Sequence, residues 1–255
     1  MQLHRLKGYI QNIYLIEYEH GCMLLDGGCR ADFDIVSDYF RTTLKRPLTD
    51  LKVVMVTHMH PDHAGCAHYL REKTGCLVVS GVFEHHWYEG LSGRFSHLTD
   101  ILLTHWVAGR LGRKRRLIWY PRKLRADVQL QDGQPVPGFE QWSIVATPGH
   151  THMDISIYSE KHELIYVADL IVSNKKQLTP PYPVHFPNIY RESVAKLKAF
   201  EGFKILMAHV EPQTISTQVL DDIMVQTPKV GQSNKQAIFN IAKKHLGFGF
   251  DSQKS

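Results

Sequence analysis

The sequence predicts a fold of the α/β class, in which short buried strands alternate with helices. Short runs rich in apolar and β-branched residues mark the strands, and segments with apolar residues at helical spacing follow several of them. Several strand-like runs end in histidine or aspartate, which suggests that the carboxyl ends of strands carry the chemistry, as in open α/β layers. With 255 residues and 43% apolar residues, the chain fits one large domain or two small ones and can bury a substantial core.

The first half of the chain contains four predicted strands and two predicted helices. The strands are expected at 9–16, 22–25, 52–56 and 76–79, and the helices at 33–45 and 64–73. A turn at 19–21 joins the first two strands, and Asp26-Gly27-Gly28 ends the second. Pro47 and Gly75 follow the two helices and mark their ends.

The second half resumes the strand pattern after residue 127. Strands are expected at 128–130, 142–146, 153–158, 163–168 and 204–208, the third and fourth forming a hairpin. A loop rich in proline and aromatic residues covers 179–187, and helices are expected at 190–200 and 234–246.

The stretch Thr57–His63 is the strongest functional signal. It places His58, His60, Asp62 and His63 in an H-x-H-x-D-H pattern between a buried strand and a helix. Imidazole and carboxylate are the ligands that suit zinc, iron and manganese. The alternative is structural: Asp62 could cap the helix, and the histidines could be satisfied core residues.

Three more strand-like runs end in residues of the same kind. His150 follows 142–146, Asp169 follows 163–168, and His209 follows 204–208. Each residue alone is weak evidence, because aspartate is common at strand ends and a single histidine is more often structural. Together with the first motif they give five histidines and two aspartates, which suits two metal ions with one carboxylate able to bridge them.

Residues 81–126 differ in character from the rest of the chain. They are rich in aromatic residues and histidine, and from 101 to 126 they contain eight basic residues and no acidic one. This segment is interpreted as a mostly helical excursion from the sheets, either a solvated basic face or a functional surface. A functional surface could cover the site or contact an anionic ligand or an acidic membrane.

In these motifs the chain resembles the metallo-β-lactamase superfamily of dinuclear hydrolases. The resemblance runs from the turn at Leu25–Gly28 to His209, with 81–126 outside it. It implies an αββα sandwich, two mixed β-sheets packed face to face with helices outside, in a single domain over 1–255 that contains the helical, basic and aromatic insertion.

The resemblance also implies a site for two divalent metal ions. Zinc is expected, and the ligand set would also accept iron or manganese. His58, His60 and His150 would bind the first ion, Asp62, His63 and His209 the second, and Asp169 would bridge both. True zinc β-lactamases usually have cysteine or serine in place of Asp169, so the aspartate is more similar to the glyoxalase II, lactonase, sulfatase and RNA-processing branches. Asp26 and His152 are candidates to orient the ligands, though His152 could equally be structural.

The expected function is that of a hydrolase using a metal-bridging hydroxide to cleave an ester-like bond (thioester, lactone or carboxylic ester) in a small molecule. Asp62 is the candidate to orient the nucleophile and pass on a proton. A first alternative is a phosphodiesterase that binds nucleic acid or phospholipid through residues 110–125. A second is an iron-dependent oxidoreductase on the same scaffold, although no second redox module is visible in the sequence.

The remaining expectations concern the cellular location of the protein, the state of its cysteines and its binding partners. No apolar run reaches membrane-spanning length and the N-terminus does not resemble a signal peptide, so a cytoplasmic location is expected. The four cysteines show no C-x-x-C pairing and are expected to be reduced thiols. The expected partner is a small-molecule substrate; a nucleic acid or anionic membrane is less favoured, and a homodimer is compatible with the exposed insertion.

Overall fold

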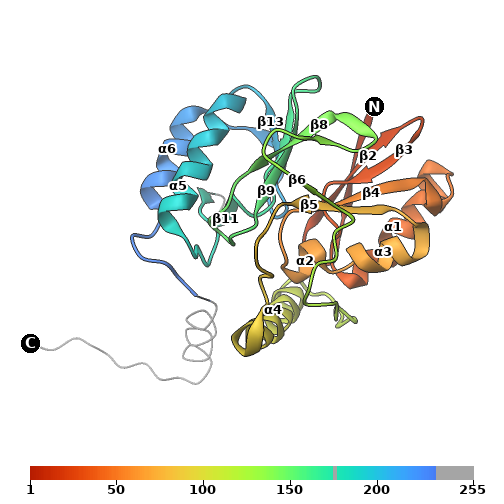
Figure 1. Cartoon of the computed structure of the whole chain (residues 1–255), viewed down its shortest axis with the longest axis horizontal. Coiled ribbons are helices and arrows are strands. Elements are labelled where there is room, and N and C mark those ends of the chain that lie inside the picture. The colour runs from red at the N-terminus through yellow and green to blue at the C-terminus, as the bar shows by residue number, and fades with distance from the viewer. Residues whose placement is uncertain (175–176, 234–255) are drawn as a thin grey trace, which may run out of the picture.

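Two mixed β-sheets packed face to face form the centre of the fold in the computed structural model, which describes residues 1–174 and 177–233 (Figure 1). Within this part of the chain the first sheet has six strands, in the order β1 (Gln2–Lys7), β2 (Asn12–Tyr18), β3 (Gly21–Leu24), β4 (Leu51–Val56), β5 (Leu77–Gly81) and β6 (Val128–Leu130). The β1–β3 pairs are antiparallel, and the pairs from β3 to β6 are parallel.

The second sheet contains the later strands of the chain. Its order is β14 (Gln213–Thr214), β13 (Lys204–Leu206), β10 (Leu164–Tyr166), β9 (Ile155–Ser159), β8 (Phe139–Ala146) and β7 (Pro135–Val136). Only the β10–β13 pair is parallel among these described strands. A separate hairpin joins β11 (Val172–Asn174) and β12 (Gln177–Thr179).

The strands are apolar because both faces of each sheet are covered. In β2 the alternate residues Tyr14 and Ile16 belong to the core between the sheets, whereas Ile13 and Leu15 belong to the core under the helices. Trp142 from β8 is fully buried in the layer between the sheets. Strands buried on both faces are read in sequence as nearly continuous apolar runs, which made β4 and β5 recognisable.

Helices cover the outer faces, so the predicted αββα sandwich is confirmed. The helices α1 (Phe33–Tyr39) and α3 (Ala67–Thr74) lie on the first sheet, and α5 (Pro187–Lys196) and α6 (Thr217–Gln226) lie on the second (Figure 1). The short helix α2 (Pro61–Ala64) follows β4. Shorter 3-10 or π turns occupy Arg30–Asp32, Phe40–Leu44, Leu48–Asp50 and Leu197–Phe200.

Three local differences from the sequence prediction have simple causes. Strand β1 was not predicted, because it is an edge strand in which only Leu6 is buried. The helix predicted at 64–73 is α3, which begins at Ala67, and Ala64 ends the separate helix α2, since the N–H of Cys66 donates to the carbonyl of Gly28 instead of continuing a helical ladder. The helix predicted at 234–246 lies outside the described residues.

The excursion predicted at 81–126 is the connection between β5 and β6, which are parallel neighbours. The helix α4 (Gly90–Arg110) projects at one end of the molecule beyond the sheets (Figure 1). Residues 111–127 contain no helix or strand, so the prediction of a mostly helical segment holds only for 90–110. No helix in the described part of the chain is long and apolar enough to cross a bilayer.

Candidate metal centre

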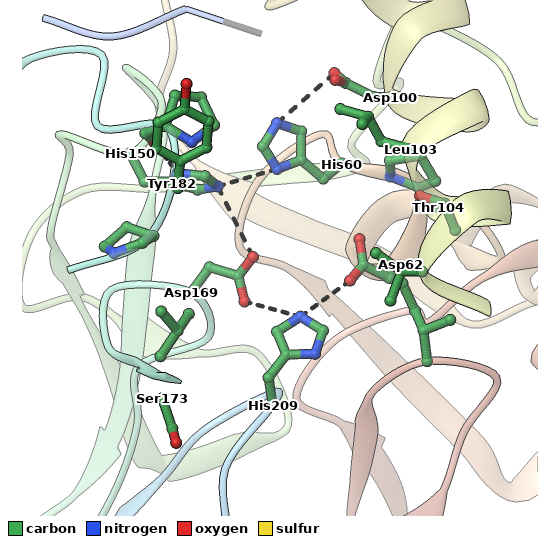
Figure 2. Close-up of a pocket in the computed structure, with 16 residues that line it drawn as sticks. His60, Asp62, Asp100, Leu103, Thr104, His150, Asp169, Ser173, Tyr182 and His209 are labelled. Atoms are coloured by element: carbon green, nitrogen blue, oxygen red, sulfur yellow. Dashed lines mark hydrogen bonds and ion pairs between the residues drawn. The ribbon is translucent and has the colours of Figure 1, made fainter. Parts of the chain in front are cut away.

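The seven residues predicted as metal ligands meet in one place, between the ends of the two sheets. The loop after β4 and the short helix α2 that follows it supply four of them, and the segments after β8, β10 and β13 supply His150, Asp169 and His209. Figure 2 shows five of the seven, His60, Asp62, His150, Asp169 and His209, facing a common space. Their donor atoms form two groups, in each of which all atoms lie within 4.8 Å of one another, with Asp169 in both.

The first group consists of three imidazoles and one carboxylate oxygen. Nδ1 of His60 lies 3.0 Å from Nε2 of His58 and 3.0 Å from Nε2 of His150. Oδ2 of Asp169 lies 3.9 Å from the His58 nitrogen and 3.8 Å from that of His150. Three ring nitrogens aimed at one point cannot all be satisfied by hydrogen bonds to each other, because a neutral imidazole has only one N–H.

The second group uses the other oxygen of the same carboxylate. Oδ1 of Asp169 lies 3.4 Å from Nε2 of His63 and 3.3 Å from Nε2 of His209. Oδ2 of Asp62 lies 3.6 Å and 3.1 Å from the same two nitrogens. Asp169 therefore presents one oxygen to each group, as a bridging carboxylate does.

The donor set fits metal ions. Nε2 of His63 and Oδ1 of Asp169 are buried, and neither forms a hydrogen bond with any described residue. Buried polar atoms without partners are rare in native proteins and call for a specific explanation, such as an ion. Imidazole nitrogen and carboxylate oxygen in two sets that share one carboxylate supply that explanation, since they match the ligands of dinuclear zinc, iron or manganese sites.

Two imidazoles of the first group, His58 and His60, are held in their uncharged form. Burial, with the neighbouring imidazoles adding to it, lowers the pKa of His58 and the pKa of His60 well below the usual value. These rings therefore stay neutral at physiological pH and keep a lone pair free, which is the state that binds a metal ion.

The second group is charged in the absence of metal. Burial alone would lower the pKa of His209, but Asp169 and Asp62 outweigh burial and raise that pKa to about 10. Burial would likewise raise the pKa of Asp169, but His63 and His209 hold it well below its usual range. Without metal, the Nε2 atoms of His63 and His209 therefore carry protons at the positions where they would bind a cation.

Asp26, one of the two candidates for orienting the ligands, is confirmed in contact with His63. Its Oδ2 accepts a hydrogen bond from Nδ1 of His63 at 2.8 Å and another from the hydroxyl of Tyr166 at 2.9 Å. Thr57 donates to the same carboxylate through its backbone N–H and its hydroxyl. Because Nδ1 of His63 donates to Asp26, its Nε2 faces the second group and would offer a lone pair there once a metal ion displaces its proton.

The other ligand rings are oriented by neighbours that the sequence did not reveal. Nδ1 of His150 donates to the carbonyl of Pro183 at 2.8 Å, and Nδ1 of His58 lies 3.1 Å from Oγ1 of Thr57. Asp100, on α4, lies 3.7 Å from His60. No sequence signal indicated these partners, since a backbone carbonyl carries no residue preference and Asp100 lies within a helix.

His152 does not orient any ligand. Its Nε2 lies 2.8 Å from the carbonyl of His85, and its ring packs beside Trp87 on the surface. The residue two positions further on, Asp154, is buried instead and accepts hydrogen bonds from the backbone and hydroxyl of Thr151. The prediction that His152 supports the ligands is therefore wrong, because the turn after His150 directs its side chain outward.

Comparison with known proteins agrees with the fold and the site. The family model of the metallo-beta-lactamase superfamily matches residues 6–209. A curated relative described as "Probable metallo-hydrolase YflN", from Bacillus subtilis (strain 168), is 22% identical over 240 residues, covering 83% of this chain and 85% of the relative.

Solved structures show the same fold at low sequence identity. The metallo-β-lactamase family protein TTHA1429 from Thermus thermophilus has a TM-score of 0.66 at 18% identity, covering 96% of this chain and 82% of that one. TTHA1623, described in a di-iron-bound form, has a TM-score of 0.59 at 19% identity, covering 89% and 99%. Similar structures also include a B3 metallo-β-lactamase.

The fold and the two His/Asp groups define a metallohydrolase. The chain belongs to the metallo-β-lactamase superfamily, whose model matches 6–209 of its 255 residues.

Proposed function

We propose that the protein hydrolyses an ester-like bond (a thioester, a lactone or a carboxylic ester) in a small molecule, with two divalent ions held by the seven residues. The observation that carries the proposal is the position of Asp169, which presents one oxygen to each donor group. Two ions bound there would lower the pKa of a shared water and polarise the carbonyl of the substrate. His58, His60 and His150 would hold the first ion, and Asp62, His63 and His209 the second.

Asp62 is the proposed catalytic residue beyond its part in metal binding. Its side chain lines the cavity that contains the site, and Oδ2 contacts His209 at 3.1 Å. From the cavity wall this carboxylate can accept a hydrogen bond from the attacking water and pass the proton to the leaving group. Burial would raise the pKa of Asp62, but His63 and His209 outweigh it and lower that pKa, so the carboxylate is ionised and ready to accept.

The cavity favours a substrate with an apolar part. It has a volume of about 340 Å³ and holds His60, Asp62, His150, Asp169 and His209 among its lining residues. The rest of its wall is mostly apolar and comes from separate segments, which contribute Ile10, Leu103, Val107, Val172, Pro181 and Tyr182. Tyr182 and Leu103 flank the site in Figure 2, on opposite sides of His60. An acyl chain or lactone ring can lie against this wall while its carbonyl reaches the centre.

A substrate screen tests this function directly. Protein loaded with zinc is offered panels of thioesters, lactones and carboxylic esters of increasing chain length. The double variant His58→Ala/His60→Ala serves as the blank, because it removes two donors of the first group and leaves the apolar cavity wall intact. Turnover by the wild type and none by the blank supports the proposal; two bound ions with no turnover on any panel overturns it.

Zinc is the proposed metal, with iron as the alternative. The donor set accepts both ions, and the solved protein TTHA1623 carries two irons on this fold. Elemental analysis of protein purified without added metal, followed by reconstitution with each ion, separates them. An iron-free preparation with full hydrolytic activity would also exclude the oxidoreductase alternative.

A second candidate, phosphodiester cleavage at an anionic lipid surface, is favoured by the surface of the excursion. The arginine and lysine residues from 110 to 125 are exposed to solvent, apart from Arg122, which is partly buried. The ion pairs of arginine in the described chain involve Arg5, Arg41, Arg46 and Arg71, all outside this stretch. Arg113, Arg116 and Arg122 donate to backbone carbonyls, which are uncharged, so their charges are not neutralised and are available to an anionic partner.

The exposed apolar face of α4, the helix that precedes this basic stretch in the chain, favours phospholipid over nucleic acid. Four residues spaced by four, three and four positions lie on one face of α4 and are exposed: Leu91 by 73%, Phe95 by 68%, Leu98 by 45% and Leu102 by 60%. An exposed apolar face on a helix of a basic segment is typical of helices that lie in the membrane interface. Nucleic-acid surfaces stack bases on several aromatic rings, whereas in the basic stretch Trp119 is exposed and Tyr120 is buried.

Vesicle sedimentation tests this second candidate. The wild type is expected to bind vesicles containing phosphatidylglycerol, to bind pure phosphatidylcholine only weakly, and to be released by salt. Replacing Arg113, Lys114, Arg115 and Arg116 by Ala should lower partitioning on the order of a thousandfold, at about 1 kcal/mol for each basic residue. The control replaces Lys52, Lys73, Lys204 and Lys229, which are exposed elsewhere. Equal effects of both variants, or self-association of the wild type as a dimer in place of vesicle binding, would reject the lipid surface.

A further inference from the structure

The excursion between β5 and β6 places an additional carboxylate beside the metal centre. Oδ2 of Asp100 lies 3.7 Å from Nε2 of His60, and the pair is joined by a dashed line in Figure 2. Both side chains are buried. His60 faces the first donor group with Nδ1, so its Nε2 must carry the hydrogen when Nδ1 binds an ion. Nε2 of His60 is buried and forms no hydrogen bond with any described residue.

Asp100 is itself held by two buried tyrosines of the same excursion. The hydroxyl of Tyr88 donates to Oδ2 of Asp100 at 2.7 Å. The hydroxyl of Tyr120 lies 3.4 Å from that of Tyr88 and donates to the carbonyl of Met59 at 2.5 Å. Tyr88 and Tyr120 are almost fully buried, so they hold Asp100 from the side that is closed to solvent, while Asp100 itself lines the cavity.

We propose that Asp100 is a positioning residue for His60, accepting the hydrogen of Nε2 when Nδ1 binds the first metal ion. This inference rests on the proposed metal-binding function. A carboxylate behind a ligand imidazole fixes its tautomer and ring orientation and makes the ring a stronger donor. Tyr88 fixes the carboxylate, and Tyr120 fixes the backbone immediately before His60. The excursion therefore supports the first metal group as well as lining the cavity.

A purely structural role gives a different expectation. If Asp100 served only to anchor Tyr88, Asp100→Asn would have little effect on metal affinity, because the amide oxygen can still accept from the Tyr88 hydroxyl, and Tyr88→Phe would have at least as large an effect. If Asp100 positions His60, removal of its charge acts on the metal, whereas removal of the Tyr88 hydroxyl leaves the carboxylate beside His60. The variants Asp100→Asn and Tyr88→Phe separate the two, because both remove little volume.

The experiment measures metal affinity, with no substrate present. Wild type and variants are loaded with cobalt and titrated with a chelator, while the visible absorption bands of the bound ion report its coordination. Asp100→Asn is expected to lower the affinity for one of the two cobalt ions by about 10- to 100-fold and to change the absorption bands of that ion. Tyr88→Phe should keep the affinity for both cobalt ions within about threefold of the wild-type values. Asp100→Glu should recover part of the affinity that Asp100→Asn loses. Near-ultraviolet circular dichroism verifies that each variant is folded.

Each outcome has a defined meaning. Wild-type protein that binds fewer than two equivalents would contradict the proposed function before Asp100 is considered. Two equivalents in the wild type with unchanged affinity in Asp100→Asn would overturn the positioning role alone. Equal losses in Asp100→Asn and Tyr88→Phe would assign Asp100 to structure. If Asp100→Asn does not fold, the Asp100→Glu titration decides, since a shifted carboxylate should still alter the cobalt bands if the contact with His60 matters.

Discussion

His63 donates through Nδ1 to Oδ2 of Asp26, a residue 37 positions earlier, at 2.8 Å. Thr57 and Tyr166 hold the same carboxylate, so the position of the ring is set by three parts of the chain. The contact turns Nε2 of His63 towards Asp62 and Asp169.

Replacing Asp26 by Ala should therefore weaken the second metal group. We expect a loss of about 10- to 100-fold in affinity for one ion, measured by competition with a chelator. Tyr166→Phe, which removes one of the hydrogen bonds to Asp26 and keeps the His63 contact, is the control and should lose much less. Unchanged binding in Asp26→Ala would show that His63 is held by its other neighbours.

Asp169 and Asp62 should differ in how many ions they affect. Asp169 presents one oxygen to each group, whereas Asp62 belongs to the second group alone. Asp169→Asn should lower the affinity for both ions, and Asp62→Asn the affinity for one. Metal content after dialysis against a graded chelator series measures this. The same stoichiometry in both variants would contradict a bridging position for Asp169.

Metal binding to the second group should strengthen as pH rises. Asp169 and Asp62 raise the pKa of His209 to about 10 against the effect of burial, so the metal-free ring is protonated at neutral pH. Its ion pair stabilises the metal-free fold fully below the usual histidine pKa, and this contribution is lost as pH rises through about 10. An ion must displace the proton, so affinity should rise about tenfold per pH unit for each proton released.

Calorimetry in two buffers of different ionisation enthalpy measures this proton release. His209→Gln is the control, because it removes the titrating ring and should reduce the number of protons released. An affinity that is constant from about pH 6 to about pH 9 in the wild type would mean that the ring is already neutral without metal.

Gly149 should be needed for the position of His150. Its φ is +144°, and a Cβ there would lie 2.5 Å from Cα and Cβ of Tyr190. Gly149→Ala should lower the free energy of unfolding by about 2–4 kcal/mol and weaken the first metal group, because α5 or the His150 turn must move. Gly133→Ala, at φ +79° with no atom within 4 Å, is the control and should cost only about 1 kcal/mol. Equal melting temperatures for the two variants would contradict this.

Val107 should control the size of the substrate. It lies on α4 at the cavity wall and is not a metal-group residue. Val107→Phe narrows the cavity, so KM for long acyl chains should rise by about tenfold or more while KM for short ones changes little. Metal content, measured alongside, should stay at the wild-type value. An equal change in KM for all chain lengths would mean that the acyl group does not lie against Val107.

The sequence was sufficient to predict that the seven candidate ligands meet, because each lies in the segment that follows a buried strand. His58 and His60 come after the apolar run of β4, and Asp169 and His209 come after β10 and β13, so local pattern and strand polarity together predict their convergence. The two-layer arrangement followed from the resemblance, since strand order depends on contacts between distant segments.

Most of the residues that orient the candidate ligands could not be predicted from the sequence. Asp100 lies in the middle of α4, and its distance from His60 depends on how that helix packs rather than on any local motif. The carbonyl of Pro183 has no signature in sequence at all. Asp26 was accessible to prediction through the family resemblance, in which its loop precedes the H-x-H-x-D-H motif, and the pairing of β3 with β4 places it there.

Each donor group takes residues from loops of both sheets. The loop after β4 contributes to both groups, and Asp169, after β10 in the other sheet, also contributes to both. Bound ions would thus cross-link the two halves of the sandwich. Chelation should shorten the lifetime of the native state against heat and protease, even where the cavity and its catalytic side chains are unchanged.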